Sequence, residues 1–180
     1  PNASIDLEKW AVIACDQYTS NEPYWKKVEA FVGDSPSTLN LIFPEFYLGK
    51  IDEAEKIKEI RDAMNDYVVK NVLENHHGMI LVERKIKNAT RYGLMAAIDL
   101  DAYDYTRTST SWIRATEGTV AERIPPRMKI REGAPLELPH ILVLVDDTEK
   151  LLIEPLVAMK DSLPVVYDFD LMMGSGHIRG

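Results

Sequence analysis

Cysteine is nearly absent from this sequence, and that scarcity narrows the classes of protein to which the chain can belong. The chain has 180 residues and one cysteine, Cys15. A single thiol forms no internal disulfide and no cysteine cluster that binds a metal. This usage fits a reducing compartment, so we expect a cytoplasmic protein. Cys15 ends an apolar run and is interpreted as a small buried side chain, with a nucleophile as the alternative.

Long apolar runs and an excess of positive charge are also missing. No run approaches the ~20 apolar residues that cross a bilayer, so we expect no membrane partner. The formal net charge is −8, which argues against a nucleic-acid partner because phosphate contacts need a basic face. The standard glycine-rich phosphate loops, Gly-x-x-x-x-Gly-Lys-Ser and Gly-x-Gly-x-x-Gly, are absent too. The chain starts at Pro1 and stops soon after a glycine-rich turn, so we expect a single domain that forms the N-terminal part of a longer protein.

Basic residues are nevertheless concentrated in one stretch, between residues 107 and 131, where only Glu117 and Glu122 oppose them. The six basic residues are Arg107, Arg114, Arg123, Arg127, Lys129 and Arg131. A local basic stretch in an acidic protein favours a small anionic ligand over a polyanion.

The part of this stretch over residues 114–131 is called the arginine segment below. Gly118 permits a tight turn whose backbone N–H groups face an anion, and Thr116 and Thr119 add hydroxyls. Forked donors for phosphate or carboxylate oxygens are supplied by Arg114, Arg123 and Arg127. Pro125 and Pro126 restrict the backbone next to Arg127. The alternative is that these arginines pair with acidic side chains of the same chain.

Several carboxylates and histidines are candidates for chemistry. Asp16 follows an apolar run, and either Asp16 or Glu117 would act as a general base or as a Mg²⁺ ligand; Asp16 as a turn former is the alternative. Asp146 and Asp147 either share a Mg²⁺ or cap a helix. The histidine pair His76 and His77 is interpreted as a solvated helix end, and His140 and His177 as acid–base groups or structural residues. No cofactor is identified, and Mg²⁺ is the one that the carboxylates suggest.

Local patterns predict three helices and five strands. Apolar periodicity and capping residues predict helices over residues 22–32, 51–73 and 149–160. Apolar or alternating runs predict strands over residues 10–15, 79–85, 91–100, 140–145 and 165–169, and residues 39–43 suggest a short extended piece. The turn at residues 87–89 predicts an antiparallel hairpin, and residues 107–139 are interpreted as an ordered loop with short strands. The fold class is therefore α/β, a mixed β-sheet flanked by helices.

Several long strings in the chain are similar to one protein family. They are Trp10-Ala-Val-Ile-Ala-Cys-Asp-Gln-Tyr-Thr-Ser, Pro23-Tyr-Trp, Pro36-Ser-Thr-Leu-Asn, Ile113-Arg-Ala-Thr-Glu-Gly-Thr-Val-Ala-Glu-Arg-Ile-Pro-Pro-Arg and Leu138-Pro-His-Ile. Together they resemble the bacterial domain-of-unknown-function family 1015 over essentially the whole chain. The resemblance implies a bacterial, cytoplasmic protein about half as long as typical members. Their later half carries an Asp-Gly-x-His motif that looks like the phosphate loop of ParB- and sulfiredoxin-like proteins, and Gly174-Ser-Gly-His does not match it.

These observations lead to one leading function and one alternative. We expect a domain that binds a phosphorylated small molecule or nucleotide, with Arg114, Arg123 and Arg127 holding the anion. The alternative is a non-catalytic scaffold or oligomerisation domain that forms, for example, a homodimer. Its arginines would then pair across the interface. The residues do not decide whether the protein is an enzyme.

Overall fold

The N-terminal part of the protein is a helical layer whose helices begin at capping side chains. The computed structural model describes residues 1–14, 18–115, 118, 120–138 and 140–180. The helices of this layer are α1 (Leu7–Trp10), α2 (Glu22–Val32) and α3 (Glu53–Val69), with the short 3₁₀ turns η2 (Thr38–Leu41) and η3 (Glu45–Tyr47) between the last two. Oxygens of Asp6, Asn21 and Asp52 accept hydrogen bonds from first-turn N–H groups. Each helix therefore starts where its sequence supplies a cap.

Two hydrophobic clusters hold this layer together. The larger cluster comprises Trp10, Leu41, Ile60, Met64, Tyr67 and Val72. The smaller one comprises Val28 and Val32 of α2 with Met172, which lies near the C-terminal strands. Met172 is fully buried, so α2 is connected to the sheet through apolar contact.

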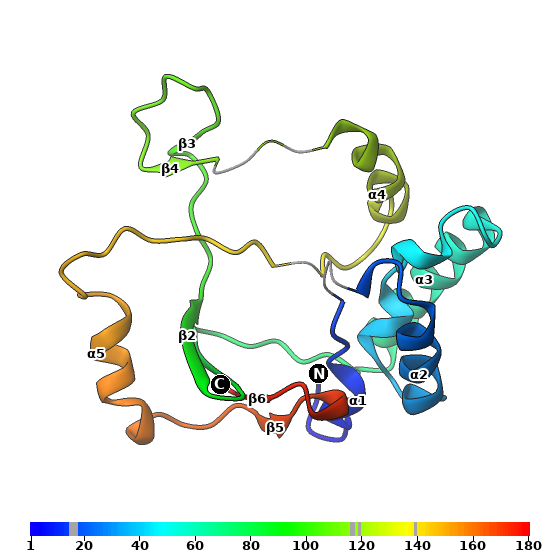
Figure 1. Ribbon diagram of the computed structural model, residues 1–180, viewed down its shortest axis with the longest axis horizontal. Coiled ribbons are helices and arrows are strands. Elements are labelled where there is room, and N and C mark those ends of the chain that lie inside the picture. Colours follow the sequence, from blue (N-terminus) through cyan, green and yellow to red (C-terminus); the bar gives the residue numbers. More distant parts are fainter. Residues whose placement is uncertain (15–17, 116–117, 119, 139) are drawn as a thin grey trace.

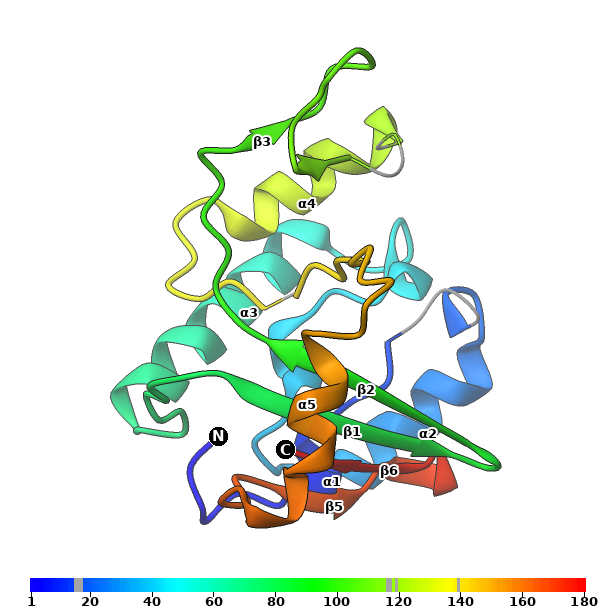
Figure 2. The ribbon, with the colours of Figure 1, turned by 90° about the vertical axis from the view of Figure 1, so that its left-hand side faces the viewer.

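A four-stranded sheet forms the second layer. Its strands are β1 (Ile80–Ile86), β2 (Ala89–Met95), β5 (Asp168–Asp170) and β6 (His177–Arg179). Their order is β2-β1-β6-β5, and every neighbouring pair is antiparallel. Helix α5 (Ile153–Ala158) crosses the β1–β2 hairpin, while α1, α2 and α3 lie towards the other side (Figures 1 and 2). Chain segments about 90 residues apart thus meet in one sheet.

The connection between β2 and α5 carries the arginine segment. It contains the parallel pair β3 (Tyr103–Asp104) and β4 (Ile113–Arg114), the 3₁₀ turn η4 (Ala121–Arg123) and helix α4 (Ile124–Arg131). Figure 1 shows this connection as an excursion away from the sheet, with α4 next to α3. The predicted α/β class with mixed strand pairing is confirmed, because an antiparallel sheet and a parallel pair occur with flanking helices.

Several predicted elements differ from the structure. Residues 11–14 form no strand; they follow α1, and the Val12 N–H donates to the Thr38 hydroxyl instead of to a neighbouring strand. The predicted extended piece at residues 39–43 begins as η2, because the Ser37 hydroxyl caps it. The predicted helix over residues 51–73 is confined to Glu53–Val69, and Asn71 has a positive φ of 52° that ends helical geometry.

The later part of the chain holds two further corrections. Residues 107–139 contain helix α4, since Pro125 and Pro126 fall in the first helical turn, where proline is tolerated. Residues 140–145 form no strand, and the helix predicted from residue 149 starts at Ile153. Pro155 likewise lies in the first turn of α5 and therefore does not split the helix.

Candidate functional site

The arginine segment places its described arginines on two different elements. Arg114 ends the two-residue strand β4, and Arg127 lies in α4. Among the described residues, no hydrogen bond or ion pair links these two side chains. Arg114 and Arg127 therefore lie in the same connection between β2 and α5, but on two different secondary-structure elements.

Both arginines have weak or local partners. The Nε of Arg114 donates to the Ser111 carbonyl oxygen over 2.7 Å, and no described carboxylate pairs with its guanidinium group. Arg127 Nη2 lies 3.9 Å from Glu45 Oε1, at the outer limit of an ion pair, and its side chain is 58% exposed. Arg131 differs, because it pairs with Glu137 at 2.7 Å. Arg114 and Arg127 thus retain donors that face solvent.

The structure describes only some of the remaining predicted ligand and catalytic residues. Gly118 is described and exposed. Thr116, Glu117, Thr119 and the predicted base Asp16 lie outside the described residues, as does the side chain of Arg123. The roles assigned to them from the sequence stay predictions.

A second concentration of charged groups lies on one face of the four-stranded sheet. The strand register places Tyr92, Glu83, Arg179 and Asp168 in one row across β2, β1, β6 and β5. A second row, two residues along each strand, contains Thr90, Lys85, His177 and Asp170. Because residues i and i+2 of a strand share a face, both rows point to the same side of the sheet. We call these eight residues the polar ladder.

Glu83 is the buried centre of the polar ladder. Its side chain is only 7% exposed, and its carboxylate accepts hydrogen bonds from Lys85 at 2.8 Å, Tyr92 at 2.8 Å and Lys160 at 3.2 Å. These partners, Lys85 first, lower the pKa of Glu83 to about 2 against the opposing effect of burial. The buried carboxylate is therefore ionised, and three donors are hydrogen-bonded to it. Lys160 connects the sheet to the turn η5 (Lys160–Ser162) that follows α5, whereas Lys85 lies on β1 itself.

His177 lies on β6, in the second row of the polar ladder, and its ring is held between two aspartates. Its Nδ1 lies 2.9 Å from Asp170 and its Nε2 lies 2.7 Å from Asp168. An imidazole donates to two carboxylates only when both nitrogens carry a proton. The hydrogen bond with Asp170, supported by Asp168, raises the pKa of His177 above its ordinary value despite partial burial. Its geometry is that of a cation bridging two anions.

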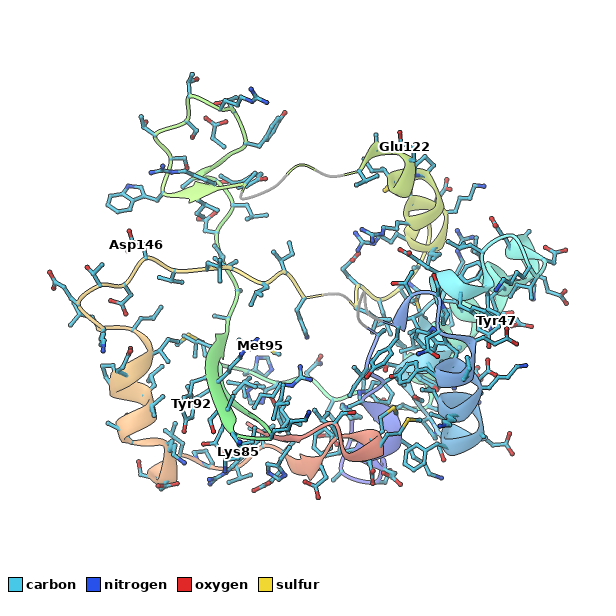
Figure 3. The ribbon with its side chains drawn as sticks, viewed as in Figure 1. Tyr47, Lys85, Tyr92, Met95, Glu122 and Asp146 are labelled. Atoms are coloured by element: carbon cyan, nitrogen blue, oxygen red, sulfur yellow. The ribbon has the colours of Figure 1, made fainter. Side chains whose placement is uncertain are left out.

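A cavity of about 250 Å³ lies beside Glu83 and the first row of the polar ladder. Polar groups of Glu83, Tyr92, Lys160 and Arg179 line it, together with His76 and His77. The remaining wall is apolar and includes Met79, Leu81, Leu163 and Val166. Lys85 and Tyr92 lie at the sheet in Figure 3, far from Glu122, which lies on the arginine segment. The two concentrations of charge are therefore separate sites.

The structure supplies no metal centre within its described residues. No group of three or more His, Cys, Asp or Glu side chains there is arranged to hold an ion. Asp147, one of the two carboxylates considered for Mg²⁺, accepts hydrogen bonds from the N–H groups of Leu151 and Leu152. These bonds lower its pKa and hold the turn before α5, so Asp147 forms a turn and does not cap the helix as the sequence alternative had it.

Sequence reasoning identified only part of the polar ladder. His177 was identified as an acid–base or structural candidate, whereas Glu83 and Lys160 were not singled out. The local signal was the spacing of Glu83 and Lys85, which are two residues apart in the strand predicted over residues 79–85 and therefore share one of its faces. That spacing does not show which strands lie beside this face.

Comparison with known proteins identifies a family. Searches of curated proteins and of solved structures found no significant match. No described helix is long and apolar enough to cross a membrane. A family model described as "protein of unknown function (DUF1015)" matches residues 1–179. Since this match covers the chain from end to end, the protein belongs to the DUF1015 family.

Proposed function

We propose that this chain is part of a bacterial cytoplasmic protein and binds a phosphorylated small molecule or nucleotide through the arginine segment. The observation that carries the proposal is the availability of the guanidinium groups of Arg114 and Arg127. Neither has a carboxylate within 3.5 Å among the described residues, since Glu45 lies 3.9 Å from Arg127. In an acidic protein, exposed arginines without close partners favour a bound anion.

The surface lysines of the helical layer provide a contrast. Lys26, Lys58 and Lys70 form ion pairs of 2.6 to 2.8 Å with acidic residues four positions away. Such pairs neutralise basic groups within one helix. Arg127 does not have this arrangement, because its contact with Glu45 joins α4 to η3 at a longer distance. A phosphate oxygen offers Arg127 a shorter, charge-assisted hydrogen bond than Glu45 does.

The ligand would be held at Arg114, Arg123 and Arg127, with Thr116, Gly118 and Thr119 adding hydroxyl and backbone donors. Glu117 or Asp16 would serve as base or as ligand of a Mg²⁺ bridged to phosphate. The sequence supports these roles through residue type and spacing, with Arg114 on β4 and Arg127 on α4.

A thermal-shift screen with nucleotides and sugar phosphates tests the proposal. Wild type and Arg114→Ala are compared with Lys58→Ala, which removes an equal charge from α3, where Lys58 pairs with Asp62. We expect wild type and Lys58→Ala to be stabilised, by about 2.7 kcal/mol for a ligand at 100 times its Kd. Arg114→Ala should be stabilised little, because it lacks one of the guanidinium groups that hold the anion. Absence of any shift, or equal shifts in all three proteins, contradicts the ligand role.

A scaffold role for the same arginines is distinguished by Arg127→Glu. If Arg127 pairs with a partner's carboxylate, the charge reversal dissociates an oligomer detected by light scattering. If Arg127 binds a ligand, the reversal abolishes the ligand-induced thermal shift and leaves the molar mass unchanged.

A further inference from the structure

We propose that residues 140–146, called the apolar segment below, form an antiparallel β-ladder with the same segment of a second copy of this chain. The ladder is two-fold symmetric and centred on Val143. The proposal starts from a conflict between sequence and structure. This segment contains the most strand-like run of the chain, Ile141 to Val145, yet it forms no strand within the protomer.

The apolar segment is exposed along its whole length. Ile141, Leu142 and Leu144 are 86%, 88% and 78% exposed, and Val143 and Val145 are 46% and 60% exposed. Figure 1 shows it as an open trace between α4 and α5. Five consecutive apolar side chains in water are unfavourable, and contiguous exposure of this kind marks an interaction site.

The backbone of the apolar segment is also unpaired. No backbone or side-chain hydrogen bond joins residues 140–146 to another part of the described chain. A row of free N–H and C=O groups is a template for strand pairing. The apolar segment therefore offers both components of a ladder, side chains and backbone.

The residues on either side of the apolar segment limit the length of the proposed ladder. Pro139, which precedes it, has no N–H and cannot continue a ladder in that direction. Asp147, which follows it, begins a turn, because its carbonyl accepts from the Lys150 N–H and its carboxylate accepts from Leu151. The seven residues between them have Val143 at their centre.

A two-fold axis at Val143 produces a complementary register. Ile141 then lies opposite Val145 of the second copy, Leu142 opposite Leu144, and Val143 opposite itself. His140 lies opposite Asp146, so an imidazole faces a carboxylate at each end of the ladder. Cross-strand pairs of this kind stabilise a sheet, whereas like charges in the same positions destabilise it. This match of a hydrogen-bond donor with an acceptor selects a second copy as the occupant, because a two-fold interface must be self-complementary.

Side-chain alternation gives the ladder two different faces. The β-branched residues Ile141, Val143 and Val145 lie on one face, and Leu142 and Leu144 lie on the other. β-branched residues favour strands, so this composition suits the proposed pairing. The proposal uses neither Arg114 nor Arg127, and its outcome is independent of the ligand role of the arginine segment.

Sedimentation equilibrium with a charge swap tests the register. We expect a wild-type dimer, an about tenfold weaker dimer for His140→Asp, and recovery for His140→Asp combined with Asp146→Lys. His77→Asp makes the same change at an exposed histidine outside the apolar segment and should leave the dimer intact. A wild-type monomer at every concentration overturns the proposal. A dimer insensitive to His140→Asp, or not restored by the double variant, overturns it as well.

Oxidative cross-linking tests the position of the two-fold axis. In a Cys15→Ser background, Val143→Cys places two thiols opposite each other, with Cα atoms about 4.5 to 5.5 Å apart, within disulfide reach. Leu142→Cys is the matched control, because Leu142 faces Leu144 instead of itself. We expect a covalent dimer for Val143→Cys and much less for Leu142→Cys. Equal cross-linking at both positions contradicts the register, and circular dichroism checks that both variants remain folded.

Discussion

The ammonium group of Lys160 lies 3.2 Å from the buried carboxylate of Glu83, 77 positions earlier in the chain. Through this contact, η5 is joined to β1 at the centre of the sheet. Lys160 Nζ also lies 3.6 Å from Asp161, which in turn is 3.5 Å from Arg179. A network of this kind makes the position of η5, and of α5 before it, dependent on one carboxylate.

Glu83→Gln should destabilise the protein by about 2 kcal/mol at neutral pH, because it removes the charge that two lysines share. The matched control is Glu59→Gln, since Glu59 forms an exposed ion pair with Lys56 on α3. Surface pairs contribute about 0 to 1 kcal/mol, so the control should change little. Urea unfolding of the three proteins measures the difference. A loss no greater than that of the control would show that the Glu83 network does not stabilise the sheet.

The same carboxylate predicts an acid-dependent loss of stability. The pKa of Glu83 is about 2 in the folded protein, below the ordinary value of 4.5. A lowered folded-state pKa contributes stability that is fully present above about pH 4.5 and is lost as the pH falls towards 2. The difference in unfolding free energy between wild type and Glu83→Gln should therefore shrink across this window. A difference that stays constant from pH 6 to pH 2.5 would contradict the assigned ionisation.

His177 predicts a dependence of the opposite sign. Its pKa is raised above 6.5 by Asp170 first and by Asp168 as well. Its contribution to stability is therefore fully present below about pH 6.5 and is lost as the pH rises through the folded-state pKa. NMR titration of the ring protons should give a pKa above 6.5 in wild type and a lower one in Asp170→Asn. Asp62→Asn, on α3, is the control. A wild-type pKa at or below 6.5 would refute the double-carboxylate bridge.

Elements with local signals were predicted well from the sequence. Helix α2 has the predicted bounds, because Asn21, Pro23 and Gly33 lie at its ends and act within one turn. The β1–β2 hairpin was predicted because Lys87 and Asn88 supply its turn, and Lys87 adopts the positive φ that the turn requires. Helix α4 was not predicted, because prolines such as Pro125 and Pro126 occur both in loops and in the first turn of a helix. The two cases differ only in where the helix begins, and the sequence does not show that position.

Features that depend on distant segments were not predicted. Residues 140–145 have strong strand propensity, but a strand exists only when a partner strand lies beside it. The polar ladder has the same dependence, since Glu83 meets Arg179 and Lys160 only after β6 and η5 have packed. Composition identified the arginine segment as a candidate, because an excess of one charge needs no long-range information, and its ligand role stays a prediction. How its residues come together depends on the fold.

Tyr67→Phe should cost about 1 to 3 kcal/mol, because one hydroxyl satisfies two donors. The buried Tyr67 hydroxyl accepts from the Ser37 N–H and from the Asn40 side-chain amide, both at 2.9 Å. Phenylalanine fills the same space and leaves both donors unpaired. Tyr105→Phe is the control, since Tyr105 is 77% exposed. Thermal or urea unfolding should separate the two variants. Equal stability would mean that water replaces the lost hydroxyl at Ser37.

Gly176→Ala should disrupt the junction between β6 and β1. Gly176 has a φ of +120°, and a Cβ at this position would overlap the backbone carbonyl oxygen of Lys85. The strand must shift to relieve the overlap, which would weaken the pairing of His177 with Lys85 and cost about 2 kcal/mol or more. Gly174→Asn is the matched control, because Gly174 has a φ of +64° in open space and asparagine tolerates this conformation. Urea unfolding gives the stability of each variant, and the NMR pKa of His177 reports the local geometry. If both variants unfold alike and His177 titrates unchanged, the close approach of β6 to Lys85 does not limit side-chain size at position 176.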